Sequence, residues 1–409
     1  MKQNGKQELR PKLRFPEFRD GPGWKVGKLS DVADFVTERV PLTRLRLVDY
    51  ISTENILPDF RGVTRASHLP SSGSAIRFQV NDVLVSNIRP YLKKVWQATQ
   101  GGGASNDVIV IRAKQGLVAE YFPYVLKSDA FIDHVMKGAK GVKMPRGDVS
   151  LMKDYGVPYP LATEQRKLAD CLSSLDEVIA VQARKVEALK DHKSGLMQQI
   201  FPWEGEKKPR FRFPEFCNSP EWEEKIGSDV FSNRIKAGRG GLPIYSVTMN
   251  DGMIARSSLD RTFDDIADPN GNKTAQRDDL VYNTMRMWQG ALGVAPEDCM
   301  VSPAYVVLAP HEDVSSEFFA YAFKFPLYLK RLASHSRGLT KDRLRLYYKD
   351  FALVPLLCPS FAEQQAIANL LASLDAMIAA QTEKLRLLRV HKLGLIQHLF
   401  PTSAEETEA

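Results

Sequence analysis

The sequence contains few of the residues that build covalent or metal cross-links, and it lacks long apolar runs. Only four of its 409 residues are cysteines, and no two of them form a Cys-x-x-Cys pair. This scatter removes the usual support for a disulfide framework or a zinc site and indicates a reducing compartment. No stretch reaches the ~18 apolar residues of a membrane span, and the polar start has no apolar signal-peptide core. These absences predict a cytoplasmic protein.

Catalytic signatures are missing as well. The sequence has no Gly-x-x-x-x-Gly-Lys-Ser/Thr loop, no His-Glu-x-x-His motif and no Gly-x-Ser-x-Gly turn. It also lacks the Asn/Asp/Ser-Pro-Pro-aromatic signature of amino methyltransferases. His391 and His398 lie seven residues apart, but two possible ligands do not make a zinc site. We therefore predict a chain that is not an enzyme, with no catalytic residue and no metal site.

The charge balance does not decide the class of partner. The 56 Lys and Arg residues exceed the 49 Asp and Glu residues, which gives a net charge of +7. This excess is mild, and many basic proteins bind no nucleic acid. A hypothesis about nucleic acid must therefore depend on where the basic residues lie.

The most informative feature of the sequence is an internal repeat. The segment Arg-Phe-Pro-Glu-Phe at 14–18 recurs at 212–216, and residues 164–202 recur at 363–401 with 19 of 39 positions identical. A repeat about 198 residues long exceeds the 20–50-residue units of solenoid proteins, so it indicates a duplicated module. A duplicated module predicts a pseudo-twofold arrangement with two similar surfaces.

Each half is predicted to contain an arm, a mixed α/β domain and one long helix. In the first half, strands are expected at 75–80, 82–85 and 108–111 and a helix at 119–137; in the second half, strands are expected at 279–282 and 304–308 and a helix at 316–333. The predicted order is an N-terminal arm (1–22), a first mixed domain (23–160), a first long helix (161–202), a linker (203–222), a second mixed domain (223–360), a second long helix (361–401) and a disordered acidic tail (402–409).

Both long helices show apolar residues at alternating spacings of four and three, which is typical of a coiled-coil seam. The pattern covers 32 residues, or about 48 Å of helix. Gln182 and Gln381 interrupt it at matching positions. We predict an α+β protein whose two repeated domains are joined by an intramolecular antiparallel coiled coil; the alternative is that each helix packs on its own domain. The predicted seam residues are Leu172, Leu175, Ile179, Gln182, Val186 and Leu189, and Leu371, Leu374, Ile378, Gln381, Leu385 and Leu388.

Basic residues recur at matching positions of the two mixed domains. Each domain has one basic segment after a predicted strand pair and a second, glycine-containing basic loop further on. Glycine lets the backbone approach a phosphate, and Lys or Arg neutralises it. The alternative is an ordinary solvated loop. The candidate DNA-binding residues are Arg89, Tyr91, Lys93, Lys94, Lys140, Lys143 and Arg146 in the first half, and Arg286, Trp288, Arg337, Lys341 and Arg343 in the second.

His192-Lys193 and His391-Lys392 also repeat, in the long helices. Two interpretations remain open for this pair. The residues are structural, at or beside the seam, or they contact a partner subunit.

With these features the chain resembles the specificity (S) subunit of Type I restriction–modification systems. The resemblance depends on two blocks that each end in a Pro-containing strand leading into Glu164-Gln165 or Glu363-Gln364, and then a long helix with Leu-Asp at 175–176 or 374–375. It implies a noncatalytic subunit that binds double-stranded DNA, with each target-recognition domain reading one half of a bipartite site. The helices would set the gap between the halves.

The resemblance also implies the partners. Two DNA adenine methyltransferase (M) subunits would dock on the helices, and restriction (R) subunits would join them. S-adenosylmethionine, ATP and Mg are expected on those subunits, and no cofactor is expected on this chain. A subunit of a Type IIB enzyme and a coiled-coil scaffold without DNA binding are the alternatives.

Overall fold

The computed structural model describes residues 9–258 and 271–401. The start of the predicted arm and the predicted acidic tail at 402–409 lie outside these residues. The chain divides into two compact units. Unit 1 comprises Met1–Gln182 with Lys384–Ala409, and unit 2 comprises Ala183–Glu383. Each long helix therefore belongs to both units: α5 (Ala162–Ile200) begins in unit 1 and ends in unit 2, whereas α10 (Phe361–Leu399) does the reverse.

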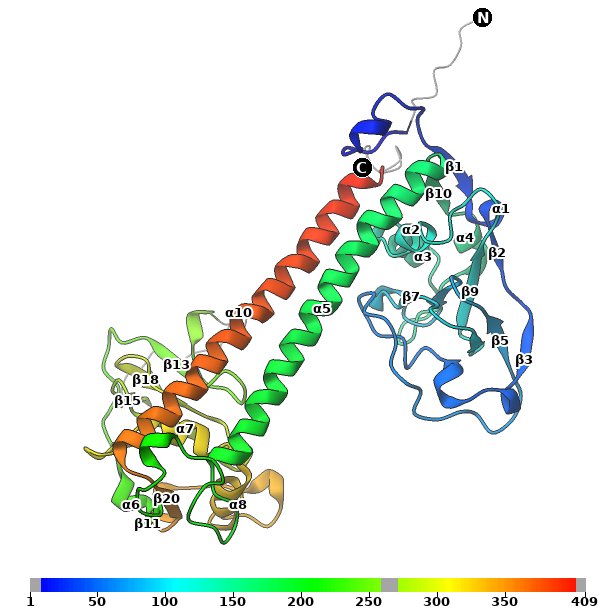
Figure 1. Ribbon diagram of the computed structural model, residues 1–409. Helices are drawn as coiled ribbons and strands as arrows, with labels where there is room; N and C mark the ends of the chain where they lie inside the picture. Colours follow the sequence, from blue (N-terminus) through cyan, green and yellow to red (C-terminus); the bar gives the residue numbers. More distant parts are fainter. Residues whose placement is uncertain (1–8, 259–270, 402–409) are drawn as a thin grey trace, which may run out of the picture. The chain divides into compact units, whose positions relative to one another are not determined.

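Unit 1 contains two four-stranded sheets and a strand pair, with short helices packed against them (Figure 1). The strand orders are β2-β9-β6-β7, β3-β5-β8-β4 and β1-β10. Neighbouring strands are antiparallel except β4 and β8, which are parallel. The strands are β1 (Lys25–Lys28), β2 (Ala33–Phe35), β3 (Arg39–Pro41), β4 (Tyr50–Ile51), β5 (Ser74–Phe78), β6 (Val83–Ser86), β7 (Val95–Gln97), β8 (Gly102–Ala104), β9 (Val108–Ala113) and β10 (Gly156–Tyr159), and the helices are α1 (Leu29–Val32), α2 (Phe122–Leu126), α3 (Asp129–Lys137) and α4 (Val149–Lys153).

Unit 2 repeats this architecture, with one strand of the second four-stranded sheet at the opposite edge. Its strand orders are β12-β19-β16-β17, β14-β13-β18-β15 and β11-β20. The strands are β11 (Glu223–Ile226), β12 (Phe231–Asn233), β13 (Ile244–Val247), β14 (Met253–Ala255), β15 (Lys273–Ala275), β16 (Leu280–Asn283), β17 (Leu292–Val294), β18 (Cys299–Val301), β19 (Tyr305–Pro310) and β20 (Pro355–Cys358), and the helices are α6 (Gly227–Val230), α7 (Ser316–Ala322), α8 (Pro326–Ser334) and α9 (Tyr348–Phe351). The prediction of two repeated mixed domains with two long helices is confirmed.

The prediction of a single helix at 119–137, and of another at 316–333, was wrong. In unit 1 the helix breaks before Ser128, whose hydroxyl accepts the Phe131 N–H and caps α3. In unit 2, Pro326 begins α8 and holds Phe325 in an extended conformation (ψ 143°). Proline disfavours helical geometry in the residue before it, so α7 cannot continue into α8.

A buried aspartate fixes the turn between the two sheets of each unit. In unit 1, Asp82 accepts the Gln79 N–H (2.8 Å) and both N–H groups of a bidentate Arg112 guanidinium (2.7 and 2.8 Å). In unit 2, Asp279 pairs with Arg234 in the same way. The turn therefore carries the chain from β5 in one sheet to β6 in the other.

The two long helices run antiparallel. In unit 1, Lys392 of α10 pairs with Asp176 of α5 (2.5 Å), and in unit 2, Lys193 of α5 pairs with Asp375 of α10 (2.6 Å). Moving 17 residues forward along α5 thus corresponds to moving 17 residues back along α10. All predicted seam residues are buried or half-buried, and Gln182 is buried with them.

The repeated arms hold the ends of these helices. Arg212 forms a bidentate ion pair with Glu363 at the start of α10 (2.7 and 2.5 Å), and the two side chains are only 4% and 1% exposed. Trp222 donates its indole N–H to the same carboxylate and packs edge-on against Phe201, just after α5. In unit 1, Arg14, Glu164, Trp24 and Phe400 form the same arrangement. Each arm therefore joins the start of one long helix to the end of the other.

Candidate nucleic-acid interface

In unit 1, backbone hydrogen bonds join the two predicted basic segments. The first segment (87–94) follows β6, and the second (137–147) follows α3. Arg89 donates its N–H to the Pro145 carbonyl (2.7 Å), and Gly147 donates to the Asn87 carbonyl (3.1 Å). Lys140 and Arg146 exchange two backbone hydrogen bonds of 2.9 Å and close a hairpin. The structure therefore brings Arg89, Lys140 and Arg146 together on one surface.

The backbone of the first segment has an unusual local geometry. The short helix η4 (Pro90–Leu92) is flanked by Arg89 and Lys93, whose φ angles are +52° and +54°. Non-glycine residues rarely adopt this left-handed conformation. In addition, Nε of Arg89 and Oδ1 of Asn87 are buried without a hydrogen-bond partner among the described residues. Strain and unsatisfied polar atoms are more frequent at functional sites than elsewhere.

The basic side chains of unit 1 fall into two groups. Lys93 pairs with Asp129 (2.6 Å), and Lys94 donates to the Thr53 carbonyl (2.6 Å), where burial lowers the pKa of Lys94. These two lysines are half-buried and already bound to partners within unit 1. By contrast, Lys140, Lys143 and Arg146 are exposed, as is Tyr91.

The exposed cations have only weak contacts within unit 1. Arg146 contacts Asp107 at 3.1 Å, and Lys140 is 3.7 Å from Asp148. Exposed ion pairs of this kind contribute about 0–1 kcal/mol. These side chains can therefore exchange their carboxylate partners for phosphates at little cost.

Unit 2 builds its surface with the same connections. Leu346 donates its N–H to the Thr284 carbonyl (3.0 Å), which joins the segment after β16 to the segment after α8. Arg337 and Arg345 exchange two backbone hydrogen bonds (2.9 and 2.8 Å) and close the hairpin. Within that hairpin, Lys341–Arg343 form the short helix η9.

The side chains of unit 2 differ in their exposure. Arg286 is exposed and contacts Gln289, and the half-buried Trp288 donates its indole N–H to the Met285 carbonyl. Arg337 pairs with Asp350 (2.5 and 2.9 Å) although its side chain is 64% exposed, and Arg343 is exposed as well.

Arg345 is not among the candidate residues predicted from the sequence. Its backbone pairs with Arg337 as that of Arg146 pairs with Lys140, so Arg345 is the counterpart of Arg146. Five residues separate the paired positions in unit 1 and seven separate them in unit 2. This two-residue difference hid the match, which the common hairpin closure reveals.

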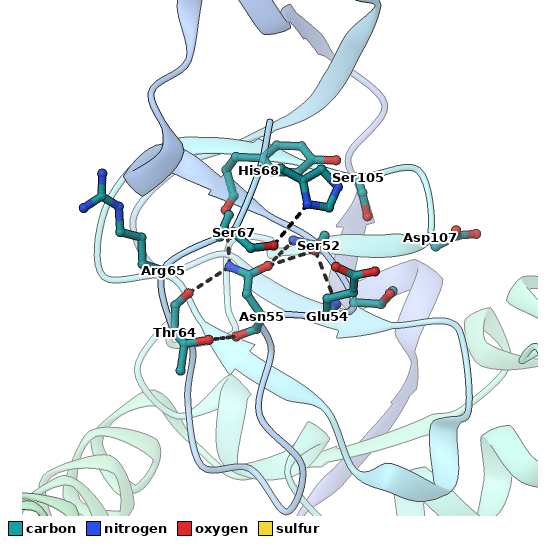
Figure 2. A pocket seen from close by; sticks show the side chains of 12 residues that line it. Ser52, Glu54, Asn55, Thr64, Arg65, Ser67, His68, Ser105 and Asp107 are labelled. Carbon is teal, nitrogen blue, oxygen red and sulfur yellow. Dashed lines mark hydrogen bonds between the residues drawn. The ribbon is translucent and has the colours of Figure 1, made fainter. Parts of the chain in front are cut away.

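A cavity of about 370 Å³ lies beside the basic surface of unit 1 (Figure 2). It is formed by the segment after β4, by residues 64–68 and by the residues before β9. Asp107, on its wall, accepts the Asn87 N–H through its carbonyl (2.8 Å) and contacts Arg146 through its carboxylate. The cavity is therefore attached to both basic segments.

Lys193 and Lys392, considered from the sequence as possible partner contacts, bind within their own units. Lys392 pairs with Asp176 and lies over the ring of Tyr124, whose hydroxyl donates to the same carboxylate (3.1 Å). In unit 2, Lys193, Asp375 and Tyr321 form the same cluster. These Tyr–Asp–Lys clusters attach each mixed domain to the helix pair.

No group of three or more potential metal ligands occurs within the described ranges 9–258 and 271–401. Over the same ranges, none of the helices combines the length and the hydropathy that crossing a bilayer requires.

Comparisons with known proteins relate the chain to one family. Residues 22–191 match the model of the Type I restriction modification DNA specificity domain. The chain is similar to the Type I restriction enzyme MjaVIII specificity subunit of Methanocaldococcus jannaschii, with 23% identity over 230 residues; the match covers 52% of this chain and only about half (48%) of that protein. It is also similar to the putative MjaX specificity subunit of the same organism, with 21% identity over 394 residues, or 90% of this chain and 84% of that protein. The crystal structure of an S subunit from M. genitalium shares the fold, with a TM-score of 0.56 at 16% identity over 97% of this chain and 100% of that chain.

Proposed function

We propose that this chain is the noncatalytic DNA-binding subunit of a restriction–modification complex. Its residues 22–191 belong to the Type I DNA specificity domain family, and the chain as a whole is a relative of Type I specificity subunits. Unit 1 reads one half of a bipartite site in double-stranded DNA, and unit 2 reads the other half. The chemistry belongs to partner subunits that hold S-adenosylmethionine, ATP and Mg.

The observation that carries this proposal is the surface built twice from the same elements. In each unit a segment after a central strand is joined by backbone hydrogen bonds to a basic hairpin closed at Lys140/Arg146 or Arg337/Arg345. The scaffold is kept while the side chains on it differ. A pair of such surfaces suits two ligands of one class with different sequences.

The exposed cations supply the contacts to the DNA backbone. Lys140, Lys143 and Arg146 in unit 1 and Arg286, Arg343 and Arg345 in unit 2 are exposed. If all six neutralise phosphates, log K falls against log salt with a slope of about −5, because each contact contributes roughly −0.9. Phosphate contacts fix the register of the protein on DNA but carry no sequence information, so base recognition needs additional groups.

The long helices set the gap between the half-sites. Each contains 39 residues, which corresponds to about 58 Å of helix. Half-sites one helical turn apart are separated by roughly 34–36 Å, so the helices are long enough to act as a spacer. The antiparallel pairing and the Lys–Asp ion pairs in each unit support a fixed register.

The outer surface of the same helices suits the docking of methyltransferase subunits. Val178 and Val181 of α5 and Leu387 and Val390 of α10, all in unit 1, are 50–56% exposed, and Met377 in unit 2 is 45% exposed. These residues lie outside the seam, where polar residues are expected on an isolated coiled coil. Exposed apolar residues at these outer positions are candidates for contact with a partner. Restriction subunits join the resulting complex.

The test is single-molecule sequencing of adenine methylation in cells that carry the chain with its methyltransferase, compared with cells that lack only this chain. We expect a bipartite motif with a fixed gap that disappears without the chain. Methylation that is unchanged by the deletion would reject the proposal.

A further inference from the structure

We propose that the cavity of unit 1 in Figure 2 receives one nucleobase edge of the first half-site, and that this base carries an exocyclic amino group, as adenine and cytosine do. This inference deepens the proposed function and depends on it, since it assumes that unit 1 binds DNA. It names a specificity-determining site that lies outside the basic segments.

The cavity has a preformed floor. Asn55 is buried, and its Oδ1 accepts from the backbone N–H (2.6 Å) and the hydroxyl (3.0 Å) of Ser52. Its Nδ2 donates to the carbonyls of Tyr50 (3.3 Å) and Thr64 (2.9 Å). Because Asn55 uses both ends of its amide, it holds the strand end and the returning segment 64–68 together. A site fixed in this way loses little conformational entropy on binding.

Hydrogen bonds and an ion pair join the opening of the cavity to the basic surface of unit 1. The ammonium group of Lys94 donates to the Thr53 carbonyl on the wall (2.6 Å). On another side, the Asn87 N–H binds the Asp107 carbonyl, and Arg146 contacts the Asp107 carboxylate. DNA held by Arg146 and Lys140 therefore lies next to the opening.

The carboxylates of Glu54 and Asp107 at the opening are hydrogen-bond acceptors. Figure 2 shows Glu54, Ser105 and His68 around the same hollow with Asp107 at its edge, while Arg65 extends away from them. Glu54 is exposed, and no side chain drawn in Figure 2 donates a hydrogen bond to its carboxylate. Carboxylates accept hydrogen bonds from the exocyclic amino groups of bases, which is the basis for the predicted base class.

The Arg146–Asp107 ion pair at the edge of the cavity couples contacts with the DNA backbone to contacts with a base. Arg146 and Asp107 are 62% and 39% exposed, so the contact between them is weak. When Arg146 turns to a phosphate, the Asp107 carboxylate is left without this cation and becomes available to a base amino group. Backbone binding thereby prepares base recognition.

Unit 2 has alanine at the two positions that correspond to Asp107 and Lys94 of unit 1. Ser86 pairs with Val108 in unit 1 and Asn283 with Tyr305 in unit 2, which aligns Asp107 with Ala304. The N–H groups of Ser86 and Asn283 bind the carbonyls of Lys94 and Ala291, which aligns Lys94 with Ala291. The two groups that tie the cavity to the basic surface are thus specific to unit 1. The amino-group preference is accordingly expected in the first half-site only.

The experiment uses the full chain in complex with its methyltransferase, acting on a randomised DNA library whose methylated molecules are sequenced. The variants are Asp107→Asn and Glu54→Gln, which keep the size of each side chain and remove the charge. The matched control is Asp154→Asn, at an exposed carboxylate of unit 1 that pairs with Lys28 on the surface.

We expect the wild type and the control to select the same bipartite motif, in which the cavity accounts for one defined position of the first half. The Asp107 or Glu54 variant should lose discrimination at that position by about tenfold, the scale of one good base contact. An unchanged second half-site, read in the same molecules, shows that the complex is assembled. If the first half-site is also unchanged, the cavity is not a base pocket, although the proposed function stands. If the wild type selects no motif, the proposed function fails, and this inference fails with it.

Discussion

Removing the charge of Glu363 should destabilise unit 2 strongly. The carboxylate is 1% exposed and accepts from Arg212, which is 4% exposed, and from the indole of Trp222. Glu363→Gln keeps the volume but leaves the Arg212 guanidinium buried without its counter-charge. Breaking one side of a buried pair costs about 3–5 kcal/mol. For a unit of about 200 residues, each kcal/mol shifts the melting temperature by roughly 2–4 °C, so a decrease on the order of 10 °C is expected.

The assay is differential scanning calorimetry with urea unfolding as an independent measure of the free energy of unfolding. The matched control is again Asp154→Asn, because the pair of Asp154 with Lys28 is 57% and 63% exposed. Its loss should cost at most about 1 kcal/mol. Equal effects of Glu363→Gln and Asp154→Asn would refute the idea that burial determines the strength of the arm contact.

Three further predictions concern titration, DNA binding and the spacer. Burial, assisted by the nearby charge of Lys392, lowers the pKa of Lys127 from its ordinary value of 10.5 to about 8. Protonated Lys127 therefore destabilises the folded state below pH 8. The free energy of unfolding of unit 1 should rise as the pH increases from 8 to 10.5. Lys127→Met should stabilise at pH 7 and lose this advantage by pH 10.5 in urea titrations, whereas the exposed Lys137→Met should show no such trend. Arg345→Ala should weaken DNA binding and reduce the salt slope by about 1, while Lys208→Ala in the linker should leave the slope unchanged. Inserting four residues into both long helices should lengthen the gap of the methylated motif, and an unchanged gap would contradict the role of the helices as a spacer.

The features that the sequence predicts well are those encoded locally or by repetition. The heptad spacing from Leu172 to Leu189 requires only that neighbouring turns of one helix bury the same face, so the helix pair follows from the pattern. The second copy of Arg-Phe-Pro-Glu-Phe indicates a shared role, which the structure identifies as the buried contact of Arg14 or Arg212 with a helix start.

Features assembled from separate segments were not predictable in this way. The cavity of unit 1 combines residues near Asn55, Ser67 and Ser105, and no periodicity connects them. Arg345 was hidden by a hairpin that differs in length between the units. The helix breaks at Ser128 and Pro326 depend on capping and proline geometry, which the apolar pattern across them masks.

The composition of unit 1 has a consequence for the synthesis of the chain. Unit 2 is one continuous stretch of sequence, but unit 1 also contains the stretch that begins at Lys384. Ile396 and Leu399 belong to the same apolar cluster as Trp24 and Leu172. On a ribosome, which extends the chain from the N-terminus, the half that is made first is therefore completed last. A chain that ends before Ile396 would carry a complete second unit and an open first core.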